Sequence, residues 1–272
     1  MSIRFAMNRT CAQQLELSAF LRLAVGAGVQ AVELRNDIAG REFADGMPAP
    51  ELKSRLEDAG LGLASVNALQ RFNEWTPQRE AEARHLISYA AALGAPGVVL
   101  CPVHDEGHGW TQADAARHLR LGLKALQSIL LEHGVTGYVE PLGMQHSTMK
   151  RQDMAVAAID EIGGWNAYRL CFDTFQFFRC GDTALFAEHI GLVHISGIAR
   201  HDLPADELSE PDRGLVFADD RVGNVAQLKS LFASGYSGFV SMEPFSPQVQ
   251  QDPQLPTKLA ASLQHLAASI GA

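Results

Sequence analysis

The sequence predicts a single (β/α)8 TIM barrel, an α/β fold, over residues 1–272. Short apolar runs alternate with segments of helical periodicity along the chain, giving eight strand-then-helix units in 272 residues, a size typical of this barrel. No linker, charge block or low-complexity segment divides the sequence. The main alternative, a doubly wound open sheet, normally has a glycine-rich turn after its first strand, and residues 8–12 (Asn-Arg-Thr-Cys-Ala) form no such turn.

The predicted strands end at intervals along the whole sequence. Their ends are expected near Asn8, Arg35, Asn67, Val103, Glu140, Asp173, Ser196 and Glu243. Between them, apolar residues recur at i, i+4, i+7 and i+11, the spacing that places side chains on one face of a helix. The clearest examples are Leu119, Leu123, Leu126 and Leu130, and near the end of the chain Leu259, Leu263, Leu266 and Ile270.

Capping residues mark where several helices begin and end. Thr76 followed by Pro77 is typical of a helix start, with proline at the first helical position. Thr111 and Asp114 have the spacing of a capping box. Glycines that can adopt the left-handed conformation are expected to end three helices: Gly28, Gly94 and Gly134.

Composition and charge exclude several functional classes. The chain is 47% hydrophobic and 19% charged, which is typical of a soluble globular protein. Its net charge of -9, without a basic run, argues against a nucleic-acid partner. No apolar stretch reaches the roughly 18 to 20 residues that span a membrane, so we expect no membrane-spanning segment. Residues 1–5 begin a strand-like pattern with no signal-peptide core, and the four cysteines form no CxxC pair. We therefore expect a cytoplasmic enzyme and leave a homo-oligomer open.

Four consecutive predicted strands, the fifth to the eighth, end in a carboxylate or an imidazole. These residues are Glu140, Asp173, His194 and Glu243. The carboxyl ends of barrel strands converge on the face that carries active sites, and three carboxylates gathered there repel one another unless a cation neutralises them. Three oxygen ligands and one nitrogen suit one divalent ion, Mn²⁺, Mg²⁺, Co²⁺ or Zn²⁺. The alternative is four ordinary strand-end residues that face solvent.

The motifs at these strand ends resemble those of the xylose isomerase-like barrel superfamily, the sugar isomerases and epimerases that share a plan with endonuclease IV. Within that superfamily the chain is most similar to 2-keto-myo-inositol (inosose) isomerases. The similarity covers nearly the whole chain and is strongest at residues 32–36 (Val-Glu-Leu-Arg-Asn), 66–69 (Val-Asn-Ala-Leu), 139–143 (Val-Glu-Pro-Leu-Gly), 172–175 (Phe-Asp-Thr-Phe), 193–195 (Val-His-Ile), 212–213 (Asp-Arg) and 241–245 (Ser-Met-Glu-Pro-Phe). The resemblance implies that the four strand-end residues bind one divalent metal.

The resemblance also implies individual roles. Glu140 and Glu243 double as acid–base groups in related epimerases, and Arg200, six residues after His194, matches a substrate-contacting arginine; the alternative for Arg200 is a place on the loop surface. Ketose 3-epimerases have a histidine where this chain has Gln176. The long acidic segment 201–223 contains the Asp-Arg pair at 212–213 and is expected to be either a lid over the site or a surface excursion.

Further substrate contacts are expected from polar residues at the other strand ends. Asn67 and Gln176 each offer a donor and an acceptor to polyol hydroxyls. His104 is either a substrate partner or a solvated loop residue. Of Glu33 and Arg35, at the end of the second strand, we expect only one to face the barrel axis; Glu33 is either a substrate contact or part of a structural ion pair.

These residues favour proton-transfer chemistry on a small keto-polyol or keto-sugar. A divalent ion that binds a carbonyl and its neighbouring hydroxyl makes the intervening C–H more acidic, and carboxylates can then move the proton. The turns after the last two strands lack the glycine-rich character of barrel phosphate sites, so we expect a neutral substrate; a sugar phosphate is the alternative that Arg200 and Arg213 leave open. A metal-dependent isomerase or epimerase of the inosose type is the favoured function. The alternatives are a dehydratase that uses the same metal and a non-catalytic sugar-binding barrel; a nuclease is disfavoured by the acidic charge.

Overall fold

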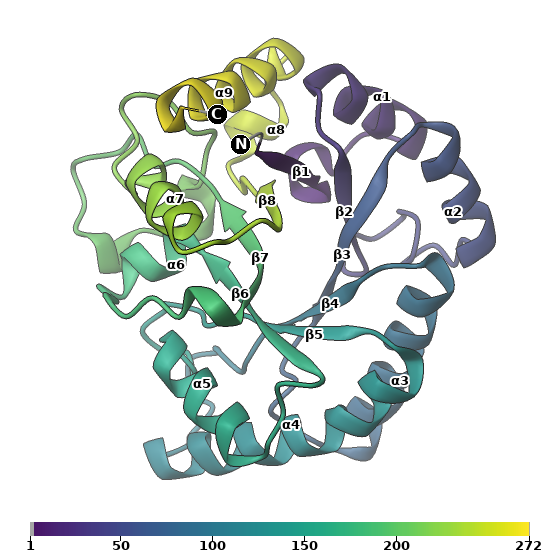
Figure 1. Ribbon diagram of the computed structural model, residues 1–272, viewed down its shortest axis with the longest axis vertical. Coiled ribbons are helices and arrows are strands. Elements are labelled where there is room, and N and C mark those ends of the chain that lie inside the picture. Colours follow the sequence, from purple (N-terminus) through teal and green to yellow (C-terminus); the bar gives the residue numbers. More distant parts are fainter. Residues whose placement is uncertain (1–2, 272) are drawn as a thin grey trace.

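A computed structural model describes residues 3–271. Eight parallel strands form a closed barrel in the order of the sequence, and pairing of the first strand with the eighth closes it (Figure 1). This confirms the predicted fold class. Residues 1, 2 and 272 of the predicted domain lie outside the described residues.

The strands end close to the predicted positions. Their bounds are β1 (Arg4–Asn8), β2 (Ala31–Arg35), β3 (Gly62–Leu69), β4 (Gly97–Leu100), β5 (Thr136–Val139), β6 (Tyr168–Asp173), β7 (Ile190–Ile195) and β8 (Phe239–Met242). Six of the eight ends agree with the sequence prediction to within one residue. The exceptions are β3, which continues two residues past Asn67, and β4, which stops three residues before Val103.

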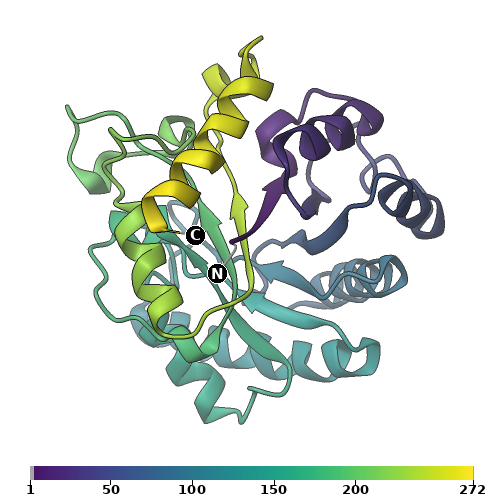
Figure 2. The same ribbon diagram turned by 45° about the horizontal axis from the view of Figure 1, so that its top comes forward.

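Helices surround the barrel on its outer side (Figure 1). They are α1 (Leu17–Ala27), α2 (Ala49–Asp58), α3 (Pro77–Leu93), α4 (Gln112–His133), α5 (Gln152–Glu161), α6 (Thr174–Arg179), α7 (Asn224–Ala233), α8 (Pro247–Gln250) and α9 (Leu255–Ile270). Helix α9 packs against α1 and α7 and so completes the outer ring (Figure 2). Within residues 3–271, no helix is both long enough and apolar enough to cross a membrane.

The predicted helix boundaries are present. The Thr76 hydroxyl accepts a hydrogen bond from the backbone N–H of Arg79, and Thr111 and Asp114 form a reciprocal capping box. A left-handed glycine follows α1, α3 and α4, as expected of residues that can take a positive φ without strain: Gly28 (φ 77°), Gly94 (φ 78°) and Gly134 (φ 65°). The four leucines of the α4 stripe are all buried.

The barrel interior is filled mainly by small side chains beneath a polar layer. A buried cluster takes one residue from most of the strands, among them Ala6, Ala31, Cys171 and Leu192. Side chains two positions apart in a strand share a face, so Asn8, Glu33, Asp173 and His194 lie above this cluster, toward the carboxyl ends of the same strands. The alternation that builds the core therefore also directs these polar groups inward.

A segment between β7 and α7 is attached to the mouth of the barrel. Gly197 and Gly214 form an antiparallel bridge through two backbone hydrogen bonds of 2.8 and 2.7 Å. A Cβ atom on Gly197 would overlap the carbonyl oxygen of Leu215, so this close approach requires glycine. Apolar contacts among Phe175, Ile198, Leu208 and Val222 add to the attachment.

Candidate active site

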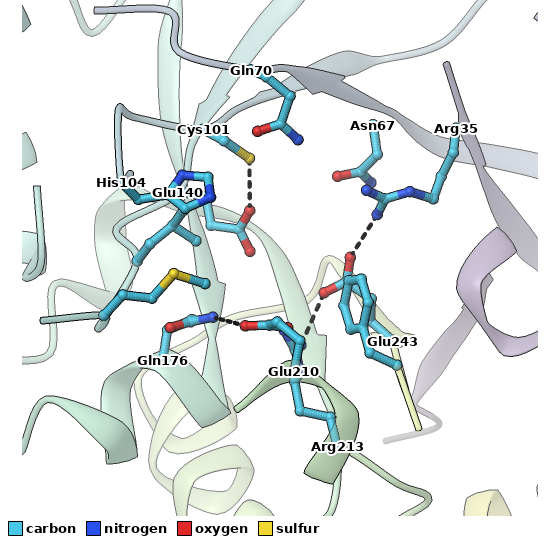
Figure 3. A pocket seen from close by; sticks show the side chains of 13 residues that line it. Arg35, Asn67, Gln70, Cys101, His104, Glu140, Gln176, Glu210, Arg213 and Glu243 are labelled. Carbon is cyan, nitrogen blue, oxygen red and sulfur yellow. Dashed lines mark hydrogen bonds and ion pairs between the residues drawn. The ribbon is translucent and has the colours of Figure 1, made fainter. Parts of the chain in front are cut away.

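A pocket of about 250 Å³ opens at the carboxyl ends of the strands (Figure 3). It is lined by residues at or just after the carboxyl ends of β2, β3, β4, β5 and β8, together with α6 and the segment after β7. Seven residues singled out in the sequence line it: Arg35, Asn67, His104, Glu140, Gln176, Arg213 and Glu243. The pocket therefore lies where a TIM barrel carries its active site.

Four buried side chains converge at one side of this pocket: Glu140, Asp173, His194 and Glu243. One donor atom from each lies within 4.8 Å of the other three. Glu140 and Glu243 directly follow β5 and β8, Asp173 ends β6, and His194 is the second-last residue of β7. Their convergence follows from the register of the barrel, in which Asp173 lies beside His194 and the ends of β7 and β8 are paired.

The donor set fits a divalent metal ion. The His194 Nδ1 atom lies 3.0 Å from Glu140 Oε1 and 3.3 Å from Glu243 Oε2, so the imidazole and the carboxylates point toward a common centre. Three carboxylates with one imidazole are ligands for hard or borderline cations such as Mg²⁺, Mn²⁺, Co²⁺ or Zn²⁺. All four groups are at least nine-tenths buried, and buried negative charges require a compensating cation.

The electrostatic environment differs between the carboxylates. Burial raises the pKa of Asp173 to about 7, although the charge of Arg213 opposes the shift. Burial also acts to raise the pKa of Glu243, but His194 and the guanidinium groups of Arg213 and Arg35 outweigh it and hold that pKa at about 2. A bound dication would favour the ionised form of Asp173 as well.

Two arginines border the carboxylates. Arg213 donates from Nη2 to Asp173 at 2.6 Å and to Glu243 at 3.0 Å, and from Nε to Ser196 at 2.9 Å. Arg35 donates to the other oxygen of Glu243 at 3.2 Å (Figure 3). The carboxylates of the cluster therefore lie beside two fixed positive charges, the guanidinium groups of Arg213 and Arg35.

The expectation that only one of Glu33 and Arg35 faces the barrel axis is wrong. Residues two positions apart in a strand share a face, and both side chains point inward. Arg35 lines the pocket and reaches Glu243. Glu33 lies deeper, wholly buried, and accepts a hydrogen bond from His194 Nε2 at 3.1 Å.

Arg200 does not reach the pocket. Its side chain is 46% exposed and is held away from the barrel by ion pairs with Asp202 and Asp212, at 2.7 and 3.2 Å. The cation that the segment after β7 directs into the pocket is Arg213. Of the two expectations for Arg200, the structure therefore shows the place on the loop surface and not the substrate contact that the resemblance implies.

Gln176, Asn67 and His104, which were expected to contact substrate, lie at the pocket, and two of them are held in place by other residues. The Gln176 amide accepts from the backbone N–H of Gly143 at 2.9 Å and donates to Glu210 at 3.0 Å. The Asn67 amide nitrogen donates to Glu33 at 2.8 Å. The His104 ring is half-buried, with Nδ1 3.0 Å from the carbonyl oxygen of Pro102. Because the amide groups of Gln176 and Asn67 are already engaged in these hydrogen bonds, their orientation toward a ligand is fixed.

Several pocket residues were not identified in the sequence: Gln70, Cys101, Leu142, Met144, Glu210 and Phe245. A usable signal existed for Cys101, because it directly follows β4 at the carboxyl end of the barrel. Burial and the neighbouring Glu140 raise the pKa of its thiol. Glu210 lies in a short 3-10 turn, Glu210–Asp212, within the long segment, where no periodicity indicates which side chains face inward.

Comparisons with solved structures agree with this architecture. The chain is similar to a xylose isomerase domain-containing protein from Salmonella typhimurium LT2, with 27% identity, a TM-score of 0.89 and 100% of both chains covered. It is also similar to the IOLI protein, whose structure contains a bound zinc atom, with 19% identity and a TM-score of 0.86 over 99% of this chain and 98% of that one. An L-ribulose 3-epimerase shares 20% identity and a TM-score of 0.71 over 99% of this chain and 94% of that one.

A search of curated proteins finds no match to this chain. A family model described as the xylose isomerase-like TIM barrel matches residues 21–269, which is most of the sequence. The match includes β2 to β8 and so all four residues of the convergent cluster. The chain therefore belongs to the xylose isomerase-like TIM barrel family.

Proposed function

We propose that the protein is a divalent-metal-dependent isomerase or epimerase of a neutral keto-polyol or ketose, of the inosose type. The observation that carries this proposal is the convergence of Glu140, Asp173, His194 and Glu243, whose donor atoms lie within 4.8 Å of one another beside a pocket. Two of the proteins with a similar fold are an L-ribulose 3-epimerase and a D-psicose 3-epimerase with D-tagatose, and the IOLI structure contains zinc. These neighbours support the proposal.

The pocket residues can divide the work of a proton transfer. A divalent ion, when bound, supplies electrophilic stabilisation for negative charge on a substrate oxygen. Glu140 and Glu243 approach the pocket from β5 and β8 (Figure 3), so one carboxylate can remove a proton from a substrate carbon and the other can return one. Arg35 and Arg213 can donate to substrate oxygens, and Leu142, Met144 and Phe245 give the pocket an apolar part of its lining.

The charges around the pocket favour a neutral substrate. Four carboxylates border it, those of Glu140, Asp173, Glu210 and Glu243, against the two guanidinium groups of Arg35 and Arg213. The sum is two negative charges, and a divalent ion would bring it to zero. No surplus of positive charge remains to attract a phosphate group. A volume of about 250 Å³ further limits the ligand to the size of a small sugar or polyol.

The proposal is tested by metal content followed by product analysis. Wild-type protein, Glu243→Gln and a control, Glu188→Gln, are loaded with Mn²⁺, Co²⁺ or Zn²⁺ and analysed by mass spectrometry; Glu188 is an exposed carboxylate far from the pocket. We expect about one ion per chain in the wild type and the control, and loss of the ion in Glu243→Gln.

The loaded protein is then incubated in D₂O with ketoses and keto-inositols, and the products are analysed by NMR. An isomer or epimer that carries deuterium at the exchanged carbon supports the proposal. A product that has lost water would instead assign a dehydratase. Absence of bound metal after loading with every ion would overturn the mechanism.

A further inference from the structure

Glu33 is a buried carboxylate that belongs neither to the four-residue cluster nor to the pocket lining. It lies on β2, its side chain has no exposed surface, and it is absent from the residues that line the cavity. Its closest charged contact is His194, whose Nε2 atom lies 3.1 Å from Glu33 Oε2. Glu33 therefore faces the side of the imidazole that points away from the three carboxylates of the cluster.

Neighbouring strands hold this carboxylate in one position. Glu33 Oε2 also accepts hydrogen bonds from the Ser65 hydroxyl and, at 2.8 Å, from the Asn67 amide, both on β3. Glu33 Oε1 lies 3.3 Å from the Asn8 amide nitrogen on β1, and the same nitrogen lies 3.1 Å from Glu243. Among residues 3–271, the ion pairs of Glu33 include no lysine or arginine. These neutral donors fix the carboxylate, so its position toward His194 is set before any ligand binds.

The geometry determines which imidazole nitrogen can act as a ligand. An ionised carboxylate only accepts hydrogen bonds, so the nitrogen that faces Glu33, Nε2, carries a proton. Nδ1 also faces carboxylates, and a divalent ion bound among them would take the place of a proton there, with the Nδ1 lone pair directed to the ion and the ring proton kept on Nε2. Nδ1 is the atom that lies among the other donors, 3.0 Å from Glu140 and 3.3 Å from Glu243.

We propose that Glu33 is a positioning residue, which fixes the His194 tautomer and ring orientation so that Nδ1 is presented to the metal. The inference rests on the metal site of the proposed function and extends it by one residue outside the ligand set. A hydrogen bond from a ligand histidine to a carboxylate orients the ring and increases its basicity as a ligand. Glu33 thereby sets the metal affinity of a site that it does not enter.

The test is the affinity of the full-length protein for Zn²⁺ and Mn²⁺, measured by competition with a chromophoric chelator. We expect affinity to fall at least about 10-fold in Glu33→Gln and about 100-fold in Glu33→Leu, the range typical of such supporting residues. The matched control is Glu42→Gln, which removes another buried carboxylate, one that pairs with Arg9 outside the pocket. Thermal unfolding of all variants separates a loss of affinity from a loss of folding, and Glu33→Gln keeps the test valid if Glu33→Leu does not fold.

A second readout follows the imidazole itself. In ¹⁵N NMR spectra of the Zn²⁺-loaded wild type, with signals assigned by comparison with His194→Gln, we expect the His194 proton on Nε2, and we expect altered ring shifts in Glu33→Gln. Wild-type affinity in Glu33→Gln, an equal loss in Glu42→Gln, or a proton on Nδ1 would overturn the positioning role while leaving the metal site intact. A wild-type protein that binds no ion would overturn the proposed function and this inference with it.

Discussion

Arg213 Nη2 lies 2.6 Å from Asp173 Oδ2, although 40 residues separate the two in the sequence. Asp173 ends β6, whereas Arg213 belongs to the segment between β7 and α7. The guanidinium is almost fully buried, and it also contacts Glu243 and Glu210, at 3.0 and 2.6 Å. The segment thus places a fixed positive charge beside two carboxylates of the cluster.

We expect Arg213→Ala to reduce kcat/KM at least about 100-fold, because loss of one fixed donor to developing charge commonly costs this much. Metal content should stay near one ion per chain, since the substitution removes a cation that contacts the same carboxylates. Steady-state kinetics and mass spectrometry on the same preparation measure both effects.

The matched control is Arg200→Ala, which removes an exposed arginine of the same segment. Its pair with Asp202 is exposed and its pair with Asp212 is partly exposed. Ion pairs at the surface contribute little, so kcat/KM should remain within about two-fold of wild type. Equal losses in the two variants would contradict the assignment of Arg213 as the pocket cation.

The bridge between Gly197 and Gly214 lies directly beside Arg213 in the chain, and we expect it to position that side chain. A Cβ atom at position 197 would overlap the backbone of Leu215, so Gly197→Ala must displace the segment. We expect a loss of about 1–3 kcal/mol in the free energy of unfolding and a higher KM. In Gly26→Ala, a control in α1 where the new Cβ has open space, we expect about 0.5–1 kcal/mol of stabilisation. An unchanged KM in Gly197→Ala would show that the bridge does not position Arg213.

Metal binding should stabilise the fold and should depend on Asp173. A ligand that binds only the native state adds about 2.7 kcal/mol to the free energy of unfolding at 100 times its Kd. We expect Tm of the wild type to rise with added Mn²⁺ and to fall again with a chelator. Asp173→Asn should show a much smaller rise, because a neutral amide replaces a charged ligand of the cluster. An equal rise in both proteins would place the ion elsewhere.

The fold was predictable because its signals are local. The α4 leucine stripe, the capping box of Thr111 and Asp114 and the left-handed glycines each depend on a few neighbouring residues, and the structure contains all of them. Strand ends were predictable for the same reason. Because the barrel brings consecutive strand ends together, these predictions also brought Glu140, Asp173, His194 and Glu243 into one cluster.

The remaining features depend on contacts that no local pattern encodes. Arg200 and Arg213 both lie in a long irregular segment, and which arginine turns inward depends on tertiary contacts such as the bridge at Gly197, the packing of Leu208 and the ion pairs of the two guanidinium groups. The inward direction of both Glu33 and Arg35 follows from strand alternation and could have been predicted. The contact between Glu33 and His194 could not have been predicted, because it joins side chains of β2 and β7 across the barrel interior.

The tyrosines make the stability of the protein sensitive to alkaline pH. Burial raises the pKa of all four, to about 12 for Tyr89 and Tyr138, against an ordinary value of about 10. As the pH rises above about 10, the unfolded chain loses these protons first, so the free energy of unfolding is unaffected below that pH and falls above it.

Tyr138, which lies inside the barrel, should account for a loss on the order of 2 kcal/mol by pH 12. Chemical denaturation at a series of pH values, with phenolate absorbance recorded in parallel, measures the decline and the ionisation together. In Tyr138→Phe the ring that packs against Gly97 and Gly191 is kept and the titrating hydroxyl is lost, so its decline should be shallower than that of the wild type. Identical declines would mean that the Tyr138 hydroxyl ionises as readily in the folded barrel as in the unfolded chain, and would contradict the raised pKa.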